Sequence, residues 1–340
     1  MKAGVLHAVG DLRCQEVPRA RPPAGWALVR VAACGVCGSD LPRIFEHGTY
    51  RLPLIPGHEL AGVLAAPAGG LAAGRAVAVY PLVPCGECAS CRRGLIQLCD
   101  GYSYLGSRGD GGFAEYAAAP VENLVPVPAG VSLEAAALTE PAAVARHALR
   151  RGGEVAGEAV WVIGAGPIGL LLVQWARQMG AGRVLVSDID EGKLALAARW
   201  GAEAVPAGPG AAWVREQTGG GAGLVVEAVG HPETVAEALC GAAKRARVVL
   251  MGNPAGEMRL AQEAYWEILR RELTLVGTWN SCGRELPGQE HDWQAALAAM
   301  AGGELEVEPL ISHRFSLAEL PAGLARLRGG ERYIKALALP

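Results

Sequence analysis

The chain has 340 residues, of which 51% are hydrophobic, and a formal net charge of −3 at pH 7. This composition describes a folded globular protein, and the length favours two domains. Acidic and basic residues are interspersed, so no basic stripe is available for nucleic acid or an anionic membrane surface. The first residues lack an apolar signal segment, and the odd number of nine cysteines fits a reducing compartment, so we expect a cytoplasmic protein.

Short apolar segments separated by glycine and proline fill residues 1 to about 130. We expect strands at Ala27–Val31, Leu60–Ala65 and Ala76–Val79. This part of the chain therefore reads as an irregular, mainly-β domain.

Three residues in this first part have side chains that bind metals. Cys37 lies in CGVCGSD, and His58 and Glu59 follow in PGHE. Cysteine, histidine and carboxylate from separate segments are ligand types of a zinc ion with an open position. Such an ion acts as a Lewis acid on an alcohol or a carbonyl. We interpret the nearby Cys34 as a packed thiol.

Four further cysteines lie close together in PLVPCGECASCRRGLIQLC, namely Cys85, Cys88, Cys91 and Cys99. This spacing suits a tetrahedral structural zinc site made of cysteine alone. A bacterial iron–sulfur run would have its fourth cysteine after three residues and then a proline, whereas Asp100 follows here. A disulfide framework does not fit a chain without a secretory signal.

A helical pattern begins after Ser132, a predicted N-cap, and runs through Leu149, with Pro141 as a restart point. Glu140 stands at this restart. On its own it reads as an ordinary carboxylate at a helix start.

Strand and helix patterns then alternate, which predicts a parallel sheet with helices on both faces. We expect strands at Ala159–Ile163, Arg183–Ser187, Leu224–Ala228, Arg247–Met251 and Leu273–Thr278, and helices at Gly166–Met179, Lys193–Trp200 and Pro232–Ala243. The apolar run Ala159–Ala176 is nearly long enough to span a membrane, but its central glycines fit a strand that turns into a helix better.

A glycine-rich turn joins the first of these strands to its helix. It reads Gly164-Ala165-Gly166-Pro167-Ile168-Gly169, and the next strand ends at Asp188. Glycines at these positions allow a tight turn, close approach of pyrophosphate and helix packing, while the carboxylate accepts ribose hydroxyls. Because the charge of Asp188 would repel a 2′-phosphate, we expect NAD.

The last segment offers a strand at Leu310–Phe315, a helix near Leu317–Leu327 and a strand at Tyr333–Leu339. We expect it to return to the first domain.

Together these motifs resemble those of the zinc-dependent medium-chain alcohol dehydrogenases, over nearly the whole chain. The stretches that carry the resemblance are CGSDLPRIF (Cys37–Phe45), GSRGDGGFAEY (Gly106–Tyr116), ILRRELTLVGTWN (Ile268–Asn280) and PGQEHDW (Pro287–Trp293). The resemblance implies a GroES-like catalytic, zinc-binding domain over 1–143 and 280–340. It implies a Rossmann-type NAD-binding domain, a doubly wound parallel sheet, over 144–279.

The same resemblance implies roles for single residues. Cys37, His58 and either Glu59 or Glu140 would hold a catalytic zinc, and Ser39 would contact the alcohol oxygen. Asp40 would orient His58. Subunits of this family usually pair through their nucleotide-binding sheets, so a homodimer or homotetramer is expected.

One departure concerns proton transfer: many relatives carry a relay histidine where this chain has Pro42. The relay would then pass from Ser39 to ribose and water, or use another group such as His47. A second departure, Gly74-Arg75 in place of Gly-Asp, has no evident catalytic meaning.

The implied reaction is the oxidation of a secondary hydroxyl to a ketone with NAD. The last two stretches favour galactitol 1-phosphate, giving tagatose 6-phosphate. Sorbitol, xylitol, 2,3-butanediol and L-threonine are alternatives, and a non-catalytic NAD-binding redox sensor or scaffold is an alternative of another class. Candidate cationic partners for a substrate phosphate are Arg43, Arg51, Arg108 and Arg284.

Overall fold

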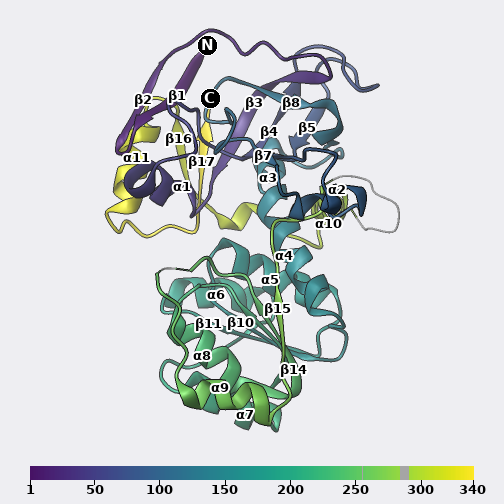
Figure 1. Ribbon diagram of the computed structural model, residues 1–340, viewed down its shortest axis with the longest axis vertical. Helices are drawn as coiled ribbons and strands as arrows, with labels where there is room; N and C mark the ends of the chain where they lie inside the picture. Colours follow the sequence, from purple (N-terminus) through teal and green to yellow (C-terminus); the bar gives the residue numbers. More distant parts are fainter. Residues whose placement is uncertain (255, 284–290) are drawn as a thin grey trace. The chain divides into compact units, whose positions relative to one another are not determined.

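The chain folds into two units, each built around its own sheet (Figure 1). The computed structural model describes residues 1–254, 256–283 and 291–340. Unit 1 comprises Met1–Ala143 and Ser281–Pro340, and unit 2 comprises Val144–Asn280. The chain thus leaves unit 1, forms unit 2 and returns.

Unit 1 is mainly β. Its seven-stranded sheet has the order β16-β17-β3-β4-β5-β9, with β8 also paired to β3. The strands are β3 (Trp26–Val36), β4 (Glu59–Leu64), β5 (Ala76–Val79), β8 (Tyr116–Pro120), β9 (Leu124–Pro126), β16 (Ile311–Ser316) and β17 (Lys335–Leu339). Two small sheets pair β1 (Lys2–Ala8) with β2 (Asp11–Glu16) and β6 (Leu82–Val83) with β7 (Ser103–Tyr104).

The expected strands of the first part are present, and the first is longer than its apolar core suggested. β3 runs on to Val36 because its C-terminal half pairs with β4 on one side and with β17 on the other. The last segment therefore returns to the first domain, as expected, and the two strands predicted in it are found as β16 and β17.

Helices of unit 1 are short. They are α1 (Asp40–Pro42), α2 (Ala89–Arg92), α3 (Leu133–Ala137), α10 (Asp292–Gly302) and α11 (Leu320–Arg328), with single turns η1 (Arg43–His47), η2 (Ile96–Leu98), η3 (Val121–Asn123) and η4 (Glu308–Leu310). Ser132 caps α3 as predicted, because its Oγ accepts a hydrogen bond from the Ala135 N–H.

The predicted helix restart lies two residues earlier than expected. The helix α4 (Thr139–Gly152) begins at Thr139 rather than at Pro141. Pro141 therefore stands in the first turn, where a missing N–H removes no helical hydrogen bond.

Unit 2 contains a six-stranded parallel sheet in the order β12-β11-β10-β13-β14-β15. The strands are β10 (Ala159–Ile163), β11 (Arg183–Ser187), β12 (Glu203–Ala204), β13 (Ala222–Glu227), β14 (Ala242–Leu250) and β15 (Thr274–Gly277), and the helices between them are α5 (Pro167–Gln178), α6 (Glu191–Arg199), α7 (Gly210–Thr218), α8 (Pro232–Gly241) and α9 (Gln262–Arg270). This strand order is that of a doubly wound dinucleotide-binding fold, which confirms the predicted fold class.

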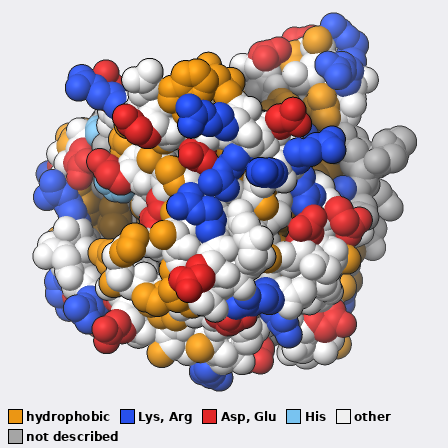
Figure 2. Space-filling view, turned by 90° about the horizontal axis from the view of Figure 1, so that it is seen from below, with side chains coloured by type: hydrophobic (Ala, Val, Ile, Leu, Met, Phe, Trp, Pro, Cys, Tyr) orange, Lys and Arg blue, Asp and Glu red, His pale blue; other side chains and the backbone are white. Residues whose placement is uncertain are grey.

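The apolar run Ala159–Ala176 forms the strand β10 and most of the helix α5, not a continuous helix. In the described part of the chain, no helix combines the length and apolar character needed to cross a bilayer. Basic and acidic side chains are interspersed on the face drawn in the space-filling view, with patches of hydrophobic side chains between them (Figure 2).

Candidate functional site

Cys37, His58 and Glu59 come together in unit 1 where β3 ends and β4 begins. These strands are antiparallel, and Gly35 is paired directly with Glu59. One donor atom each from Cys37, His58 and Glu59 lie within 4.8 Å of one another. His58 is 4% exposed and Glu59 1%. The strand pairing thus brings a half-buried sulfur donor together with buried nitrogen and oxygen donors.

Asp40 orients two members of this cluster. Its Oδ2 accepts a hydrogen bond of 2.9 Å from the Cys37 N–H, and its Oδ1 lies 3.4 Å from His58 Nδ1. The other ring nitrogen, Nε2, is then the one available to a metal. Burial alone would lower the pKa of His58, but the charges of Asp40 and Cys37 outweigh it and raise the pKa well above its usual value.

Ser39 and Arg43 lie beside Cys37. The Ser39 hydroxyl donates to Cys37 Sγ at 3.3 Å and accepts a hydrogen bond of 2.9 Å from Arg43 Nη1. Arg43 Nη1 also lies 3.8 Å from Asp40 Oδ1. Arg43, expected as a candidate phosphate partner, therefore contacts the hydroxyl expected to meet the substrate oxygen.

Glu140 lies near the cluster, but it is not one of the three residues whose donors lie within 4.8 Å of one another. Its Oε1 accepts a hydrogen bond of 3.1 Å from the Tyr104 hydroxyl, and the Tyr104 ring meets His58 edge-on with centroids 5.6 Å apart. Burial is the main cause that raises the pKa of Glu140 to about 7.

Lys335 completes the cluster, and no sequence motif marked it. Its Nζ lies 2.6 Å from Glu59 Oε1 and 2.5 Å from Glu59 Oε2, and it donates to the Val36 carbonyl at 3.0 Å. Burial alone would lower the pKa of Lys335, but the charge of Glu59 outweighs it, and the pKa is raised. A lysine at the first position of the C-terminal strand gave no signal, and only the sheet order brings it to Glu59.

The donor set fits zinc. A thiol, an imidazole and a carboxylate are zinc ligands, and one donor atom from each lies within 4.8 Å of the others. Cys34 is fully buried and lies outside the donor group, as expected of a packed thiol.

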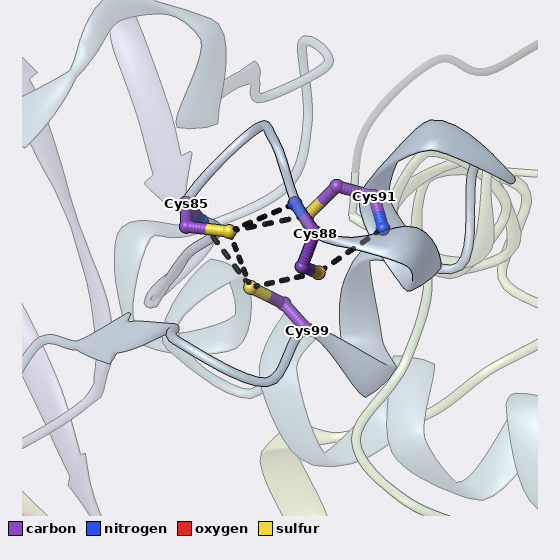
Figure 3. Close-up of side chains that lie close together, drawn as sticks. All are labelled: Cys85, Cys88, Cys91 and Cys99. Carbon is purple, nitrogen blue, oxygen red and sulfur yellow. Dashed lines mark hydrogen bonds between the residues drawn. The ribbon is translucent and has the colours of Figure 1, made fainter.

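The second donor group is the lobe formed by Cys85, Cys88, Cys91 and Cys99, whose sulfur atoms face one another (Figure 3). Three sulfur–sulfur separations are 3.5, 3.8 and 4.0 Å. Zinc–sulfur bonds of about 2.3 Å arranged as a tetrahedron would place the sulfurs roughly 3.8 Å apart. The spacing therefore suits a zinc ion without further rearrangement.

Backbone N–H groups point at these sulfurs, which favours the thiolate form. The N–H groups of Cys85, Cys88 and Cys91 donate to Cys99, Cys85 and Cys88 at 3.2, 3.4 and 3.4 Å (Figure 3). The bond from Cys91 is the largest cause that lowers the pKa of Cys88 to about 6.

The glycine-rich turn of unit 2 has the shape of a dinucleotide loop. Gly164 has φ +98°, and a Cβ at Gly169 would lie 1.8 Å from the Gly164 carbonyl oxygen. Nothing lies within 4 Å of a Cβ built on Gly166, so the backbone there is open to a ligand. Pro167 and Ile168 start α5, whose N-terminus follows the turn.

Asp188 directly follows β11, which ends one residue earlier than predicted, and it contacts the turn directly. Its Oδ2 accepts a hydrogen bond of 2.6 Å from the Ala165 N–H, and its Oδ1 accepts one of 2.8 Å from the Asp190 N–H. The carboxylate is thus held beside the glycine-rich turn.

Two of the expected features cannot be placed. Arg284 and most of the stretch Pro287–Trp293 lie outside the described residues.

Comparisons with known proteins agree with this architecture. Residues 23–129 match the alcohol dehydrogenase GroES-like domain, and residues 167–302 match the zinc-binding dehydrogenase family. Galactitol 1-phosphate 5-dehydrogenase of Escherichia coli K12 is 38% identical over 85% of each chain, and D-altritol 5-dehydrogenase of Agrobacterium fabrum is 36% identical over 93% of this chain and 94% of its own.

Solved structures give the same result. A crystal structure of galactitol-1-phosphate dehydrogenase from Escherichia coli superposes with a TM-score of 0.92, at 34% identity over 100% of both chains. A structure from Sinorhizobium meliloti 1021, described as a zinc-binding dehydrogenase bound to NADP, has a TM-score of 0.88 at 32% identity over 100% of this chain and 99% of that one. With the matched domains and the shared fold, the chain belongs to the zinc-binding alcohol dehydrogenase family of oxidoreductases.

Proposed function

We propose that the chain is a polyol dehydrogenase that uses zinc and NAD to oxidise the secondary hydroxyl at carbon 5 of galactitol 1-phosphate, giving tagatose 6-phosphate. The observation that carries the proposal is the cluster of Cys37, His58 and Glu59 with Ser39 beside it. Two relatives above 35% identity are named as 5-dehydrogenases of a six-carbon polyol or its phosphate, which supports the substrate class.

In this proposal each unit has its own role. Unit 1, with boundaries close to 1–143 and 280–340, holds a catalytic zinc on Cys37, His58 and either Glu59 or Glu140, and a structural zinc on the four cysteines of the lobe. Unit 2 holds NAD on Gly164, Gly166, Pro167, Ile168, Gly169 and Asp188. When bound, zinc supplies a Lewis acid that makes a substrate hydroxyl easier to deprotonate, and NAD supplies the hydride acceptor.

In this proposal Ser39 takes the proton from the substrate hydroxyl. Arg43 donates to its Oγ and so fixes the side chain, but a guanidinium is always protonated and cannot carry the proton further. Because Pro42 replaces the relay histidine, the proton leaves Ser39 by another route, through ribose and water or through His47, whose side chain is 73% exposed.

Asp188 supports NAD as the cofactor, because a carboxylate at the ribose repels a 2′-phosphate. The NADP bound by the Sinorhizobium meliloti relative makes this choice worth testing. We expect kcat/KM for NAD+ to exceed that for NADP+ at least about tenfold, and Asp188→Ser to narrow the ratio. Equal use of both cofactors by the unchanged protein would contradict the choice of NAD.

Among the described arginines, Arg108 is the best anchor for a substrate phosphate. Its guanidinium lies between two rings, 4.0 Å from the Tyr50 centroid and 4.5 Å from the Tyr102 centroid. Tyr102 in turn contacts Tyr104, with centroids 6.2 Å apart, and Tyr104 borders His58. Arg51 is instead neutralised by Asp110 at 2.9 Å.

The substrate is tested by NAD+ reduction with galactitol 1-phosphate, galactitol, D-altritol, sorbitol, xylitol, 2,3-butanediol and L-threonine. A preference for the phosphate ester of about a hundredfold in kcat/KM, near 2.7 kcal/mol, would support a dedicated phosphate pocket. A preference for a neutral polyol would support the proposed reaction but contradict a phosphorylated substrate.

The Arg108→Met variant tests whether Arg108 binds the substrate phosphate without affecting the rest of the site. We expect kcat/KM for galactitol 1-phosphate to fall roughly tenfold to a hundredfold, because a charge-assisted hydrogen bond contributes about 1.5–3 kcal/mol. Activity on galactitol should change less than about twofold. Arg51→Met is the matched control, and an equal loss in both variants would rule out a specific anchor at Arg108.

We also propose a homodimer or homotetramer that assembles through unit 2. The strand β15 is at the edge of the sheet. Exposed hydrophobic side chains lie on or beside β15 and on α9: Tyr265 54%, Trp266 42%, Leu269 51%, Leu275 42% and Trp279 51%. An edge strand flanked by such side chains favours pairing with a second copy. The mass in solution tests this, and Leu275→Lys should shift it towards the monomer.

A further inference from the structure

Unit 2 contains a pocket of about 740 Å³ that lies apart from the glycine-rich turn. Among the described residues, its lining includes one acidic side chain, Glu267, and four basic ones: Arg215, Lys244, Arg270 and Arg271. Lys244 and Arg270 are exposed, whereas the other three are half-buried. A pocket of this size is typical of small-molecule sites, and its excess of positive charge favours an anion. We call it the basic pocket.

The basic pocket lies at the edge of the sheet opposite to the glycine-rich turn. Gly219 and Gly220, which line it, precede β13, and Lys244 is the third residue of β14. Gly164 instead follows the carboxyl end of β10. Because these strands are parallel, the two places are about one strand length apart, roughly 17–20 Å. An occupant of the basic pocket is therefore a second ligand, distinct from a dinucleotide on the turn.

Two of the guanidinium groups are fixed by the backbone. Arg215 Nη1 donates to the Cys240 carbonyl at 2.6 Å. Arg271 Nη1 donates to the Ala242 carbonyl at 2.7 Å, and its Nε contacts Glu267. A guanidinium has five N–H donors, so both groups keep donors for a ligand. Guanidinium groups held in place in this way suit the oxygens of a phosphate group.

The other two cations are free of acidic partners. Lys244 and Arg270 make no ion pair within residues 1–254, 256–283 and 291–340, and Arg270 lies 5.0 Å from the Trp266 ring centroid. The carboxyl ends of α7, α8 and α9 are also at this edge. Each helix end contributes about half a negative charge, so together with Glu267 they do not cancel four cations. The basic pocket therefore keeps a net positive charge.

The backbone beside the basic pocket is strained at two points. Arg245 and Glu272 have φ +60° and +50°, which residues other than glycine rarely adopt. They directly follow Lys244 and Arg271, and the Arg245 N–H donates to the Arg271 carbonyl at 2.6 Å. Strain of this kind persists where surrounding contacts fix it, and it is concentrated at ligand sites. The two basic segments are thus joined by a hydrogen bond.

The helix α9 has separate basic and apolar faces. Glu267, Arg270 and Arg271 are spaced three and four residues apart, so they share one face. Tyr265 and Leu269 are four residues apart and share another, which is exposed. A subunit contact through the apolar face therefore leaves the basic face available.

We propose that the basic pocket binds a polyphosphate anion, either inorganic or as part of a nucleotide. Several cations are distributed around a space larger than a single phosphate group, so a chain of phosphates matches them better than one phosphate does. This site is separate from the dinucleotide turn, from both groups of metal donors and from Arg108. The inference does not depend on the proposed substrate.

The test is a calorimetric titration of tripolyphosphate, and separately of ATP, into protein saturated with NADH. Bound NADH prevents ATP from occupying the dinucleotide site. We expect one probe ion to bind per chain, more weakly as the salt concentration rises. ATP binding at least about tenfold tighter than tripolyphosphate would assign the pocket to a nucleotide, and comparable or weaker ATP binding would assign it to the phosphate chain alone.

Lys244→Ala/Arg270→Ala is the variant that removes the two unpaired cations. Both side chains are exposed, so we expect the variant to fold, and its thermal unfolding checks this. The affinity for both probes should fall at least about tenfold, because hydrogen bonds between a cation and a phosphate are stronger than neutral ones. An unchanged affinity would overturn the proposal.

Arg13→Ala/Arg259→Ala is the matched control. It also removes two exposed arginines, with side chains 64% and 80% exposed, and neither lines the basic pocket. Its affinity for both probes should stay within about twofold of the unchanged protein, as should that of Arg108→Met. The absence of binding, an equal loss in the control, or a loss in Arg108→Met would each overturn the proposal.

Discussion

The four-cysteine lobe takes all its donors from residues 85–99, and Cys85 is exposed. The cluster around Cys37 takes its donors from the end of β3 and the start of β4, and its ammonium group from β17. The lobe leaves no vacant ligand position and no buried counter-charge, which suits a structural ion. The Cys37 cluster offers varied donors with a hydroxyl and a lysine beside them, which suits chemistry. The local spacing of its cysteines is enough to form the lobe, whereas the Cys37 cluster depends on the pairing of strands across the whole sheet.

The largest expected effect separates the two sites by activity. Cys37→Ala should lower kcat at least about a hundredfold, because a Lewis acid is worth several kcal/mol in the transition state. Metal content should fall from about two ions per chain to about one, while NAD binding, measured by titration, stays the same. Turnover that survives this change would show that the catalytic site lies elsewhere.

Cys88→Ser should act on stability rather than on chemistry. Losing a metal that binds only the folded lobe removes several kcal/mol of local stability, because metal binding and folding of the lobe are coupled. Limited proteolysis should then cut within residues 85–99, while kcat measured well below the unfolding temperature stays within about threefold. A loss of kcat as large as that of Cys37→Ala would contradict the division of roles.

Gly35→Ala places a methyl group against the Glu59 carboxylate. The close approach of 2.0 Å forces the carboxylate or the strand to move, and we expect a cost of about 1–3 kcal/mol in the free energy of unfolding. Catalytic metal affinity should fall while the cysteine lobe keeps its ion. Chemical denaturation and metal analysis measure the two effects. Loss of the lobe's ion instead would show that the two sites are not independent.

The smallest effect is expected for Cys34→Ala, three positions from Cys37. The Cys34 thiol is buried and donates only a weak hydrogen bond to the Gly35 carbonyl at 3.7 Å. Removing its sulfur should cost about 1 kcal/mol and leave both metal ions in place. A metal content below that of the unchanged protein would make Cys34 part of the site.

The sequence predicts the cysteine lobe and the dinucleotide unit better than it predicts the Cys37 cluster. The cysteine spacing and the glycine-rich turn were readable because each is contained in one short segment. The doubly wound sheet was predicted from alternating patterns, but its helices α7 and α9 were not, since neither has a side-chain cap at its N-terminus. The contact of Arg43 with Ser39 depends on the single turn η1, which no motif marks. Lys335 was beyond reach because its partner is fixed by the order β17-β3-β4 alone.

The pairing of Lys335 with Glu59 also has a consequence for biosynthesis. A ribosome adds about 5–20 residues each second, so the 276 positions between them correspond to roughly 14–55 s. During that interval the nascent chain carries Glu59, Cys37 and His58 without the strand that supplies the ammonium group. A divalent ion that binds during synthesis would meet a more negative group of donors than one that binds the finished protein. The preference of the site among divalent ions therefore need not be the same at these two stages.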